Sequence, residues 1–302
     1  MQVISKNSVE EFISKQLATW PLAAENFANL KEVRRKEFNI GDLKGYVQCN
    51  PARVKSTTAD VKKAVEMNNG NCFLCSVNRP KEQITLNVLD GWDVLVNPYP
   101  ILPIHLTIVN QTHIPQSEIP KAIIQFAEIF PSLAVFYNGA GAGASAPAHM
   151  HLQAVERNEL PLINLINDLE GYISFSPQWS DSLGLDIPFS FIYGKIADKQ
   201  LDSKIFNFGG PNENGEFTNL KMVNAFFWKG NDGEVRYIII PRINHRPTCY
   251  FQNPPERRLV SPGCIDMAGV IITPSEEDFR IINDGDILKI YSEVAFKNDS
   301  QH

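Results

Sequence analysis

The sequence predicts an α+β fold with a mainly antiparallel β-sheet. Short runs rich in β-branched and aromatic residues begin at Ile84, and turns containing glycine or proline separate them. Segments with hydrophobic residues at helical spacing lie between these runs. Strands joined partly by hairpins and partly by helices are typical of this class. With 302 residues, 43% of them hydrophobic, the chain can build one large or two ordinary cores.

The first half is predicted to open with a short amphipathic helix capped by Ser8, because Glu11 stands where a capping box needs it. A polar stretch with several arginines follows, and strands then alternate with helices. Asp90-Gly91 is typical of a tight hairpin, and Pro120 suits the first turn of a helix. The expected strands are Ile84–Leu89, Trp92–Asn97, Ile104–Val109, Leu133–Tyr137 and His149–Val155, and a further helix is expected over Leu160–Leu169.

The second half repeats part of this pattern. Met222–Trp228 and Glu234–Ile240 flank a glycine-containing turn and predict a hairpin. Ile108–Pro115 and Ile240–Pro247 both contain an apolar strand end, a few polar residues and then His-x-Pro. The match is short, and coincidence is the alternative explanation. If it reflects a duplication, the chain divides into an N-terminal half over 1–175, which carries the chemistry, and a diverged C-terminal half over 176–302.

Composition excludes several classes of function. The formal net charge of −6 argues against a protein that binds nucleic acid through bulk phosphate attraction. No apolar stretch approaches the length of a membrane span, and the N-terminus lacks the pattern of a secretory signal. Five cysteines fit a reducing compartment better than a disulfide scaffold. We therefore expect a cytoplasmic protein without nucleic-acid or membrane partners, and no pattern predicts its oligomeric state.

The segment from Asn138 to Gln153 carries the most chemical information. Alternate side chains of a strand share one face, so His149, His151 and Gln153 are predicted to point the same way. Met150 and Leu152 then point into the core. Two imidazoles and an amide in a row require solvent, a ligand or a metal.

A loop of alternating glycine and alanine precedes this row and is predicted to bind phosphate. Gly139, Gly141 and Gly143 would let backbone N–H groups approach an anion closely, and Ser145 would add a hydroxyl. Attack by a neutral imidazole on a phosphorus held there would give a covalent nucleotidyl-histidine. The Gln153 amide would donate to a phosphoryl oxygen as charge develops. An ordinary turn and a metal-binding or accidental histidine pair are the alternatives.

These residues resemble the nucleotidyltransferase branch of the histidine-triad superfamily. That branch includes galactose-1-phosphate uridylyltransferase, diadenosine tetraphosphate phosphorylase and GDP-L-galactose phosphorylase. The resemblance implies a histidine-triad-like antiparallel sheet with helices and two related halves. It also implies that His151 is the nucleophile, that Gln153 stabilises the intermediate and that Ser145 contacts phosphate. Gln153 stands where hydrolases of the superfamily usually carry a third histidine, which implies transfer to phosphate or a sugar phosphate.

Further segments extend the resemblance. Val96–Pro100, together with Ile104–Ile108 and His113, is similar to the superfamily's strand–loop–strand before the nucleotide pocket. Asn50–Arg53 is similar to a segment that supplies arginine to phosphates, and Ser261–Gly269 is similar to part of the phosphorylases. The expected nucleotide and phosphate contacts are Arg53, Asn97, Asn138, Gly141, Gly143, Ser145, Arg242 and His245.

Cys72 and Cys75 have the spacing of a zinc-binding pair, but a tetrahedral site needs two more ligands. His113 and His149 are the candidates, and the uridylyltransferases similarly use such a set for a structural zinc. The alternative is a pair of reduced cysteines packed as small hydrophobic residues. His105 is predicted to be a hydrogen-bonded structural histidine. No organic cofactor is expected.

The function predicted from these features is a nucleotidyltransferase or phosphorylase. It would cleave a dinucleoside polyphosphate or a nucleoside diphosphate-sugar through nucleotidyl-His151, with phosphate or a sugar phosphate as acceptor. One alternative is a nucleotide hydrolase of the same fold. The other is a non-catalytic, zinc-stabilised nucleotide-binding protein.

Overall fold

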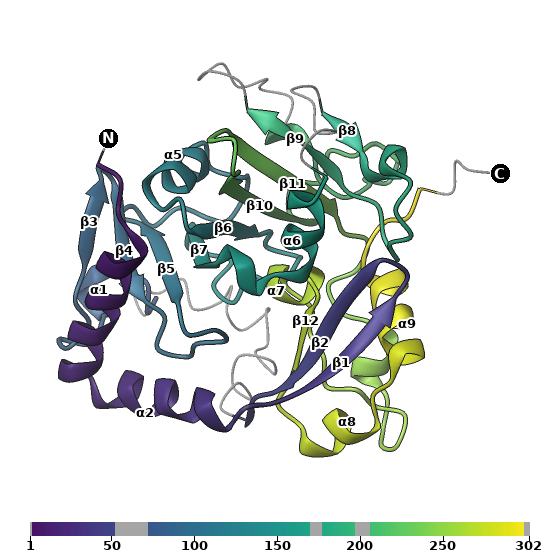
Figure 1. Cartoon of the computed structure of the whole chain (residues 1–302), viewed down its shortest axis with the longest axis horizontal. Helices are drawn as coiled ribbons and strands as arrows, with labels where there is room; N and C mark the ends of the chain where they lie inside the picture. Colours follow the sequence, from purple (N-terminus) through teal and green to yellow (C-terminus); the bar gives the residue numbers. More distant parts are fainter. Residues whose placement is uncertain (1, 52–71, 170–176, 197–205, 299–302) are drawn as a thin grey trace.

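The computed structural model describes residues 2–51, 72–169, 177–196 and 206–298, and it confirms the predicted α+β class. Its centre is an antiparallel sheet with the strand order β3-β4-β5-β7-β6-β10-β11-β9-β8 (Figure 1). The strands are β3 (Leu86–Leu89), β4 (Trp92–Val96), β5 (His105–Asn110), β6 (Leu133–Asn138), β7 (His151–Glu156), β8 (Gln178–Trp179), β9 (Ile192–Ile196), β10 (Val223–Lys229) and β11 (Val235–Pro241). The predicted strands are present, but β7 begins at His151 and not at His149.

The strand order is symmetric about the β6–β10 pair, where Asn138 lies opposite Asn224. Outward from this pair, β6-β7-β5-β4 and β10-β11-β9-β8 repeat one order. In each set the first strand is followed by the next strand of the chain and then by the two strands that precede it in the chain. This order makes β11 the counterpart of β7, whereas the sequence match set the end of β11 beside the end of β5. The predicted division at residue 175 lies outside the described residues, so the two-domain boundaries stay a prediction.

A second, smaller sheet consists of β1 (Arg34–Ile40), β2 (Leu43–Cys49) and β12 (Val270–Thr273), with β12 parallel to β2. From the sequence, the β1 region is predicted only as a polar stretch. The reason is that β1 exposes most of its residues and buries Phe38, so it lacks a clear apolar alternation.

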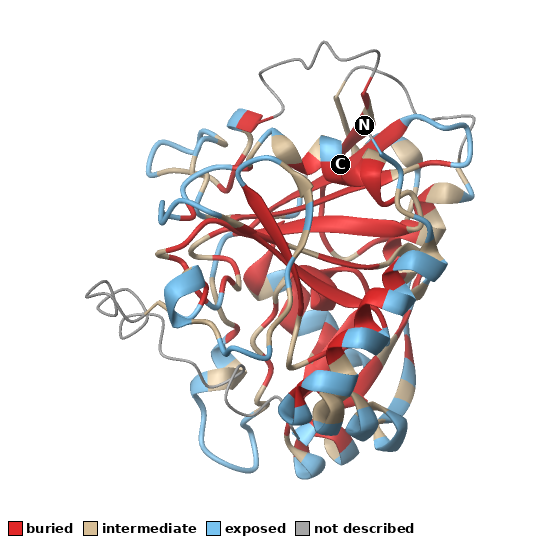
Figure 2. Cartoon of the chain, turned by 90° about the vertical axis from the view of Figure 1, so that its left-hand side faces the viewer, coloured by how far each residue is buried: buried red, intermediate tan, exposed pale blue. Residues whose placement is uncertain are grey.

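Helices and the small sheet cover both faces of the large sheet (Figures 1 and 2). Helices α1 and α5 pack on one face, where Phe12 and Phe126 join the side chain of Phe227. The small sheet with α6, α7 and α9 packs on the other, where Ile163 and Ile290 join Trp228. The helices are α1 (Lys6–Thr19), α2 (Pro21–Asn29), α5 (Ala122–Ile129), α6 (Pro161–Asn167), α7 (Cys264–Met267), α8 (Glu276–Ile281) and α9 (Asp284–Val294).

Helix ends follow local sequence signals. The α1 cap is Ser5, which accepts from the Ser8 N–H, so the helix begins earlier than the predicted Ser8 cap. Prolines occupy the first turn of α2 and α6. Short 3-10 segments occur at Leu30–Glu32, Ser76–Asn78, Arg157–Glu159, Ser180–Leu183 and Thr248–Phe251. Within the described ranges, no helix combines the length and apolarity needed to cross a membrane.

Candidate active site

A cavity of about 510 Å³ opens beside the middle of the large sheet. His151 and Gln153 of β7, Thr107 of β5 and Asn138 of β6 line it. The first part of the chain supplies a largely apolar section, namely Trp20, Leu22, Phe73, Leu74, Pro80, Leu95, Pro98 and Tyr99. The last part supplies the apolar side chains of Cys264, Ile265 and Ile272 and a group that we call the polar section, namely His245, Arg246, Ser261, Gly263 and Asp266. The cavity therefore offers both apolar and polar surface, which suits a nucleoside joined to phosphates.

His151 is held in one tautomer. Its Nδ1 lies 2.8 Å from the carbonyl oxygen of His149. Because a carbonyl only accepts, Nδ1 carries the proton and Nε2 carries the lone pair. The ring is buried, and burial lowers the pKa of His151 to about 4. His151 is thus a neutral imidazole with a basic nitrogen at the wall of the cavity, which is the form that attacks phosphorus.

Gln153 is oriented by His105 on the neighbouring strand. The backbone N–H of Ile101 donates to His105 Nδ1 (3.1 Å), so His105 Nε2 carries the ring proton. That Nε2–H donates to Gln153 Oε1 at 2.8 Å. The Gln153 amide NH₂ group is therefore left to donate toward the cavity, as the predicted role requires. His105 is a hydrogen-bonded structural histidine, as expected, and it also fixes the orientation of Gln153.

Asn97 and Asn138 both line the cavity, where the sequence analysis expected them. Asn138 Oδ1 accepts from Asn224 Nδ2 (2.9 Å) and from the Cys264 N–H (2.8 Å). Its Nδ2 amide is consequently the group that can donate to a ligand. Asn224 was not predicted, because its role depends on lying opposite Asn138 in the sheet. The two residues belong to paired strands, β10 and β6, that are far apart in the sequence.

The glycine-rich loop reaches the cavity through Gly143, Ala144 and Ser145. Gly143 has φ +95°, and a Cβ there would lie 2.7 Å from Gly263 Cα, so this position needs glycine. Gly141 does not line the cavity. Its N–H donates to the Lys221 carbonyl, and the Gly139 N–H donates to the Val223 carbonyl. Gly141 is therefore not placed for the phosphate contact predicted for it, while Gly143 and Ser145 line the cavity.

His149 does not share a face with His151, contrary to prediction, because the strand begins two residues later. Its Nε2–H donates to the Asn110 carbonyl oxygen (2.8 Å), and its Nδ1 faces two sulfurs. With both nitrogens turned away from the cavity, His149 is not placed to act on a substrate there. Its backbone carbonyl, in contrast, fixes the His151 tautomer.

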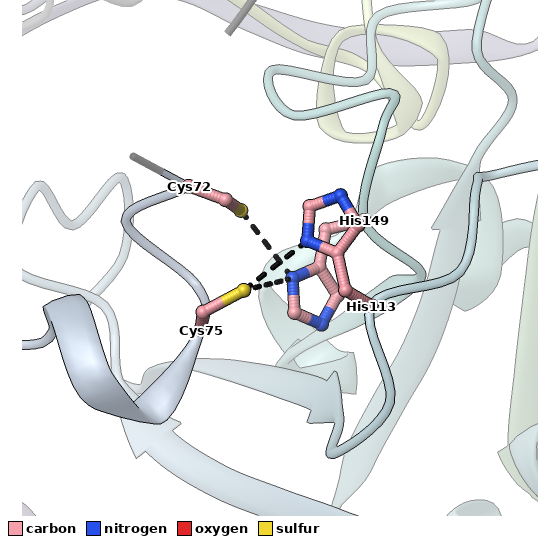
Figure 3. A group of neighbouring side chains, drawn as sticks. All are labelled: Cys72, Cys75, His113 and His149. Atoms are coloured by element: carbon pink, nitrogen blue, oxygen red, sulfur yellow. Dashed lines mark hydrogen bonds between the residues drawn. The ribbon is translucent and has the colours of Figure 1, made fainter. Parts of the chain in front are cut away.

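Cys72, Cys75, His113 and His149 form one cluster in which all ligand atoms lie within 4.8 Å of one another (Figure 3). His149 Nδ1 lies 3.3 Å from Cys72 Sγ and 3.6 Å from Cys75 Sγ, and His113 Nδ1 lies 3.1 Å from Cys75 Sγ. Around a tetrahedral zinc, ordinary bond lengths place nitrogen and sulfur ligands about 3.5 Å apart. The donor set and its spacing therefore fit zinc. The Asn110 carbonyl further fixes the His149 tautomer with Nδ1 free to bind metal.

Arg242 and His245 occupy positions different from those predicted. Arg242 is fully buried and does not line the cavity, so it is not placed for the predicted direct phosphate contact. Its guanidinium donates to the Asn224 side chain and to four backbone carbonyl oxygens, at Pro262, Asn244, His245 and Val294. His245 does line the cavity, and its Nδ1–H donates to the Gly141 carbonyl (3.1 Å). Burial, with a smaller effect of Arg246, lowers the pKa of His245 to about 4.

The remaining predicted contact, Arg53, lies outside the described residues. Trp20, Tyr99 and Thr107 line the cavity but were not predicted. Thr107 pairs with Gln153 across β5 and β7, so a correct strand register would have identified it. The roles of Trp20 and Tyr99 depend on long-range packing that no local pattern encodes.

Comparisons with known proteins agree with this architecture. A family model described as a domain of unknown function (DUF4922) matches residues 12–156, and no curated protein matches the chain. The crystal structure of yeast Ap4A phosphorylase Apa2 is similar over 93% of this chain and 95% of that one, with a TM-score of 0.59 and 14% identity. The same enzyme in complex with Ap4A gives a TM-score of 0.57 at 14% identity, covering 93% and 98% of the two chains. The chain thus shares its fold with yeast Ap4A phosphorylase Apa2 over nearly its whole length.

Proposed function

We propose that this protein is a nucleotidyltransferase or phosphorylase that works through a covalent nucleotidyl-His151 intermediate. The observation that carries the proposal is the bond from His151 Nδ1–H to the His149 carbonyl, which leaves Nε2 as a nucleophile at the cavity wall. The fold shared with an Ap4A phosphorylase supports the reaction class. The donor would be a dinucleoside polyphosphate or a nucleoside diphosphate-sugar.

In the first step, His151 Nε2 attacks the phosphorus next to the nucleoside, and the P–O bond to the leaving group breaks. The new N–P bond turns the ring into an imidazolium, whose Nδ1–H stays bonded to the His149 carbonyl. The Gln153 amide donates to a phosphoryl oxygen in the transition state. In the second step, an acceptor oxygen attacks the same phosphorus, and the N–P electron pair returns to Nε2.

We propose further that the cysteine–histidine cluster binds a structural zinc. Zinc would hold the turn at Cys72 and Cys75 against the segment that precedes β7. It would do no chemistry on the substrate, because the four candidate ligands already complete a tetrahedral set. The ligand His149 is also the residue whose carbonyl orients His151, so the metal would position the nucleophile indirectly.

Turnover of a panel of dinucleoside polyphosphates and nucleoside diphosphate-sugars, with and without inorganic phosphate, tests this proposal. The turnover rate of a phosphorylase increases steeply with the concentration of inorganic phosphate, and that of a transferase increases with the concentration of a sugar phosphate. Turnover that is independent of any phosphate acceptor would indicate a hydrolase. Tight nucleotide binding without turnover would indicate a binding protein and contradict the proposal.

A further inference from the structure

The polar section of the cavity contains one charged group of each sign among the described lining residues, Arg246 and Asp266. Asp266 is buried, and its two carboxylate oxygens accept from the N–H groups of Gly263 and Ile272. Its charge is thus partly balanced by backbone dipoles. Arg246 is the cationic side chain among the described residues that line this section.

Arg246 is held in a defined orientation. Its Nε donates to Ser261 Oγ (2.9 Å), and its guanidinium stacks on the Tyr250 ring at 4.2 Å from the centroid. A guanidinium fixed in this way loses little conformational entropy when it binds a phosphoryl group.

The buried Arg242 holds both segments that build this section. Its N–H groups donate to the carbonyls of Asn244 and His245, immediately before Arg246, and to that of Pro262, immediately after Ser261. One guanidinium therefore sets the distance between the backbone that carries Arg246 and the backbone that carries Ser261. A buried network of this kind indicates a preorganised site.

We propose that Arg246, positioned by Ser261, Tyr250 and Arg242, forms the subsite for the anionic group exchanged at the nucleotidyl-His151 phosphorus. The inference rests on the proposed function. Displacement through one nucleophile makes the leaving group of the first step and the acceptor of the second step occupy the same side of the phosphorus, opposite His151. The subsite therefore binds a phosphoryl anion in both steps, either free phosphate or the phosphate of a sugar phosphate. In the second step an acceptor oxygen forms the P–O bond as the N–P bond breaks, and any acceptor proton stays on the product.

Nucleoside phosphorimidazolides allow the Arg246 subsite to be tested separately from the proposed His151 chemistry. Their leaving group is imidazole, which carries no phosphate, so adduct formation from them reports on His151 and the fold alone. Wild type, Arg246→Gln, Arg246→Lys and the exposed control Arg257→Gln would be loaded with the four common nucleoside phosphorimidazolides. The rate of adduct loss would then be followed by intact mass at increasing inorganic phosphate or hexose 1-phosphate.

The second-order rate constant for the acceptor is expected to fall about 10- to 100-fold in Arg246→Gln, the loss typical of a charge-assisted hydrogen bond. Arg246→Lys should lose less, and Arg257→Gln should match wild type. A fall with only one acceptor would support the subsite and identify its natural ligand. Loss of the adduct at the wild-type rate in Arg246→Gln would overturn the subsite and leave the proposed function standing. No adduct in wild type from any imidazolide would overturn both.

Discussion

Two neighbouring regions of the molecule use the same hydrogen-bonding device for opposite purposes. In the cysteine–histidine cluster, the Asn110 carbonyl takes the proton of His149 Nε2 and leaves Nδ1 facing the sulfurs. On β7, the His149 carbonyl takes the proton of His151 Nδ1 and leaves Nε2 at the cavity. A backbone carbonyl thus decides which nitrogen is basic, and two histidines separated by one residue are suited to metal binding and to nucleophilic attack.

The contrast between a metal-binding His149 and a nucleophilic His151 requires that His151 be the nucleophile. His151→Ala is expected to reduce turnover by at least about 10³-fold, because the covalent route is lost while the cavity remains. Steady-state kinetics and a thermal melt of the same sample would check this. Turnover within about tenfold of wild type in a folded His151→Ala protein would contradict the assignment.

Removing a cluster cysteine tests the other region. Cys72→Ser is expected to abolish zinc binding, which we expect at one ion per chain, and to lower the melting temperature. Turnover should fall by about 10- to 100-fold, because His149 and the carbonyl that orients His151 lose their anchor. Metal analysis and kinetics would be compared with Cys249→Ser, whose cysteine lies outside the cluster. Wild-type protein purified without any bound metal, yet fully active, would show that the cluster is only a packing of side chains.

His105 sharpens the comparison, because it is a third histidine whose tautomer is set by the backbone. His105→Phe removes the donor to Gln153 Oε1 and should lower kcat about tenfold with a smaller change in KM. The double variant with Gln153→Ala should be no worse than Gln153→Ala alone. Additive losses would mean that His105 acts independently of Gln153.

His245 gives the smallest expected effect. Its Nδ1–H is also fixed by a carbonyl, and burial lowers its pKa from 6.5 to about 4. Between these two pH values His245 is protonated in the unfolded chain but neutral in the folded chain. The free energy of unfolding therefore decreases as the pH falls from about 6.5 to about 4. His245→Gln should flatten part of this dependence in denaturant titrations at several pH values. An identical pH dependence in the variant would show that His245 is protonated normally in the fold.

Local patterns predicted the strands, because alternation and turn residues are short-range signals, whereas the chemistry of the His149–Gln153 segment stays a prediction. They misplaced His149, since alternation was extended two residues beyond the true strand start at His151. They also assigned Arg242 to the ligand, because the sequence records a guanidinium but not the four carbonyls that surround it. Burial and tautomer depend on contacts between distant segments, and these became visible only in the folded chain.

Intact-protein mass spectrometry tests the central claim most directly. Wild type and His151→Ala would be incubated, without phosphate, with dinucleoside polyphosphates and nucleoside diphosphate-sugars, and the adduct would be located by fragmentation. The expected result is a mass gain of one nucleoside monophosphate on His151, absent in the variant and lost when the acceptor is added. An adduct on another residue, or turnover of a donor with no adduct under these conditions, would contradict the claim that His151 is the nucleophile.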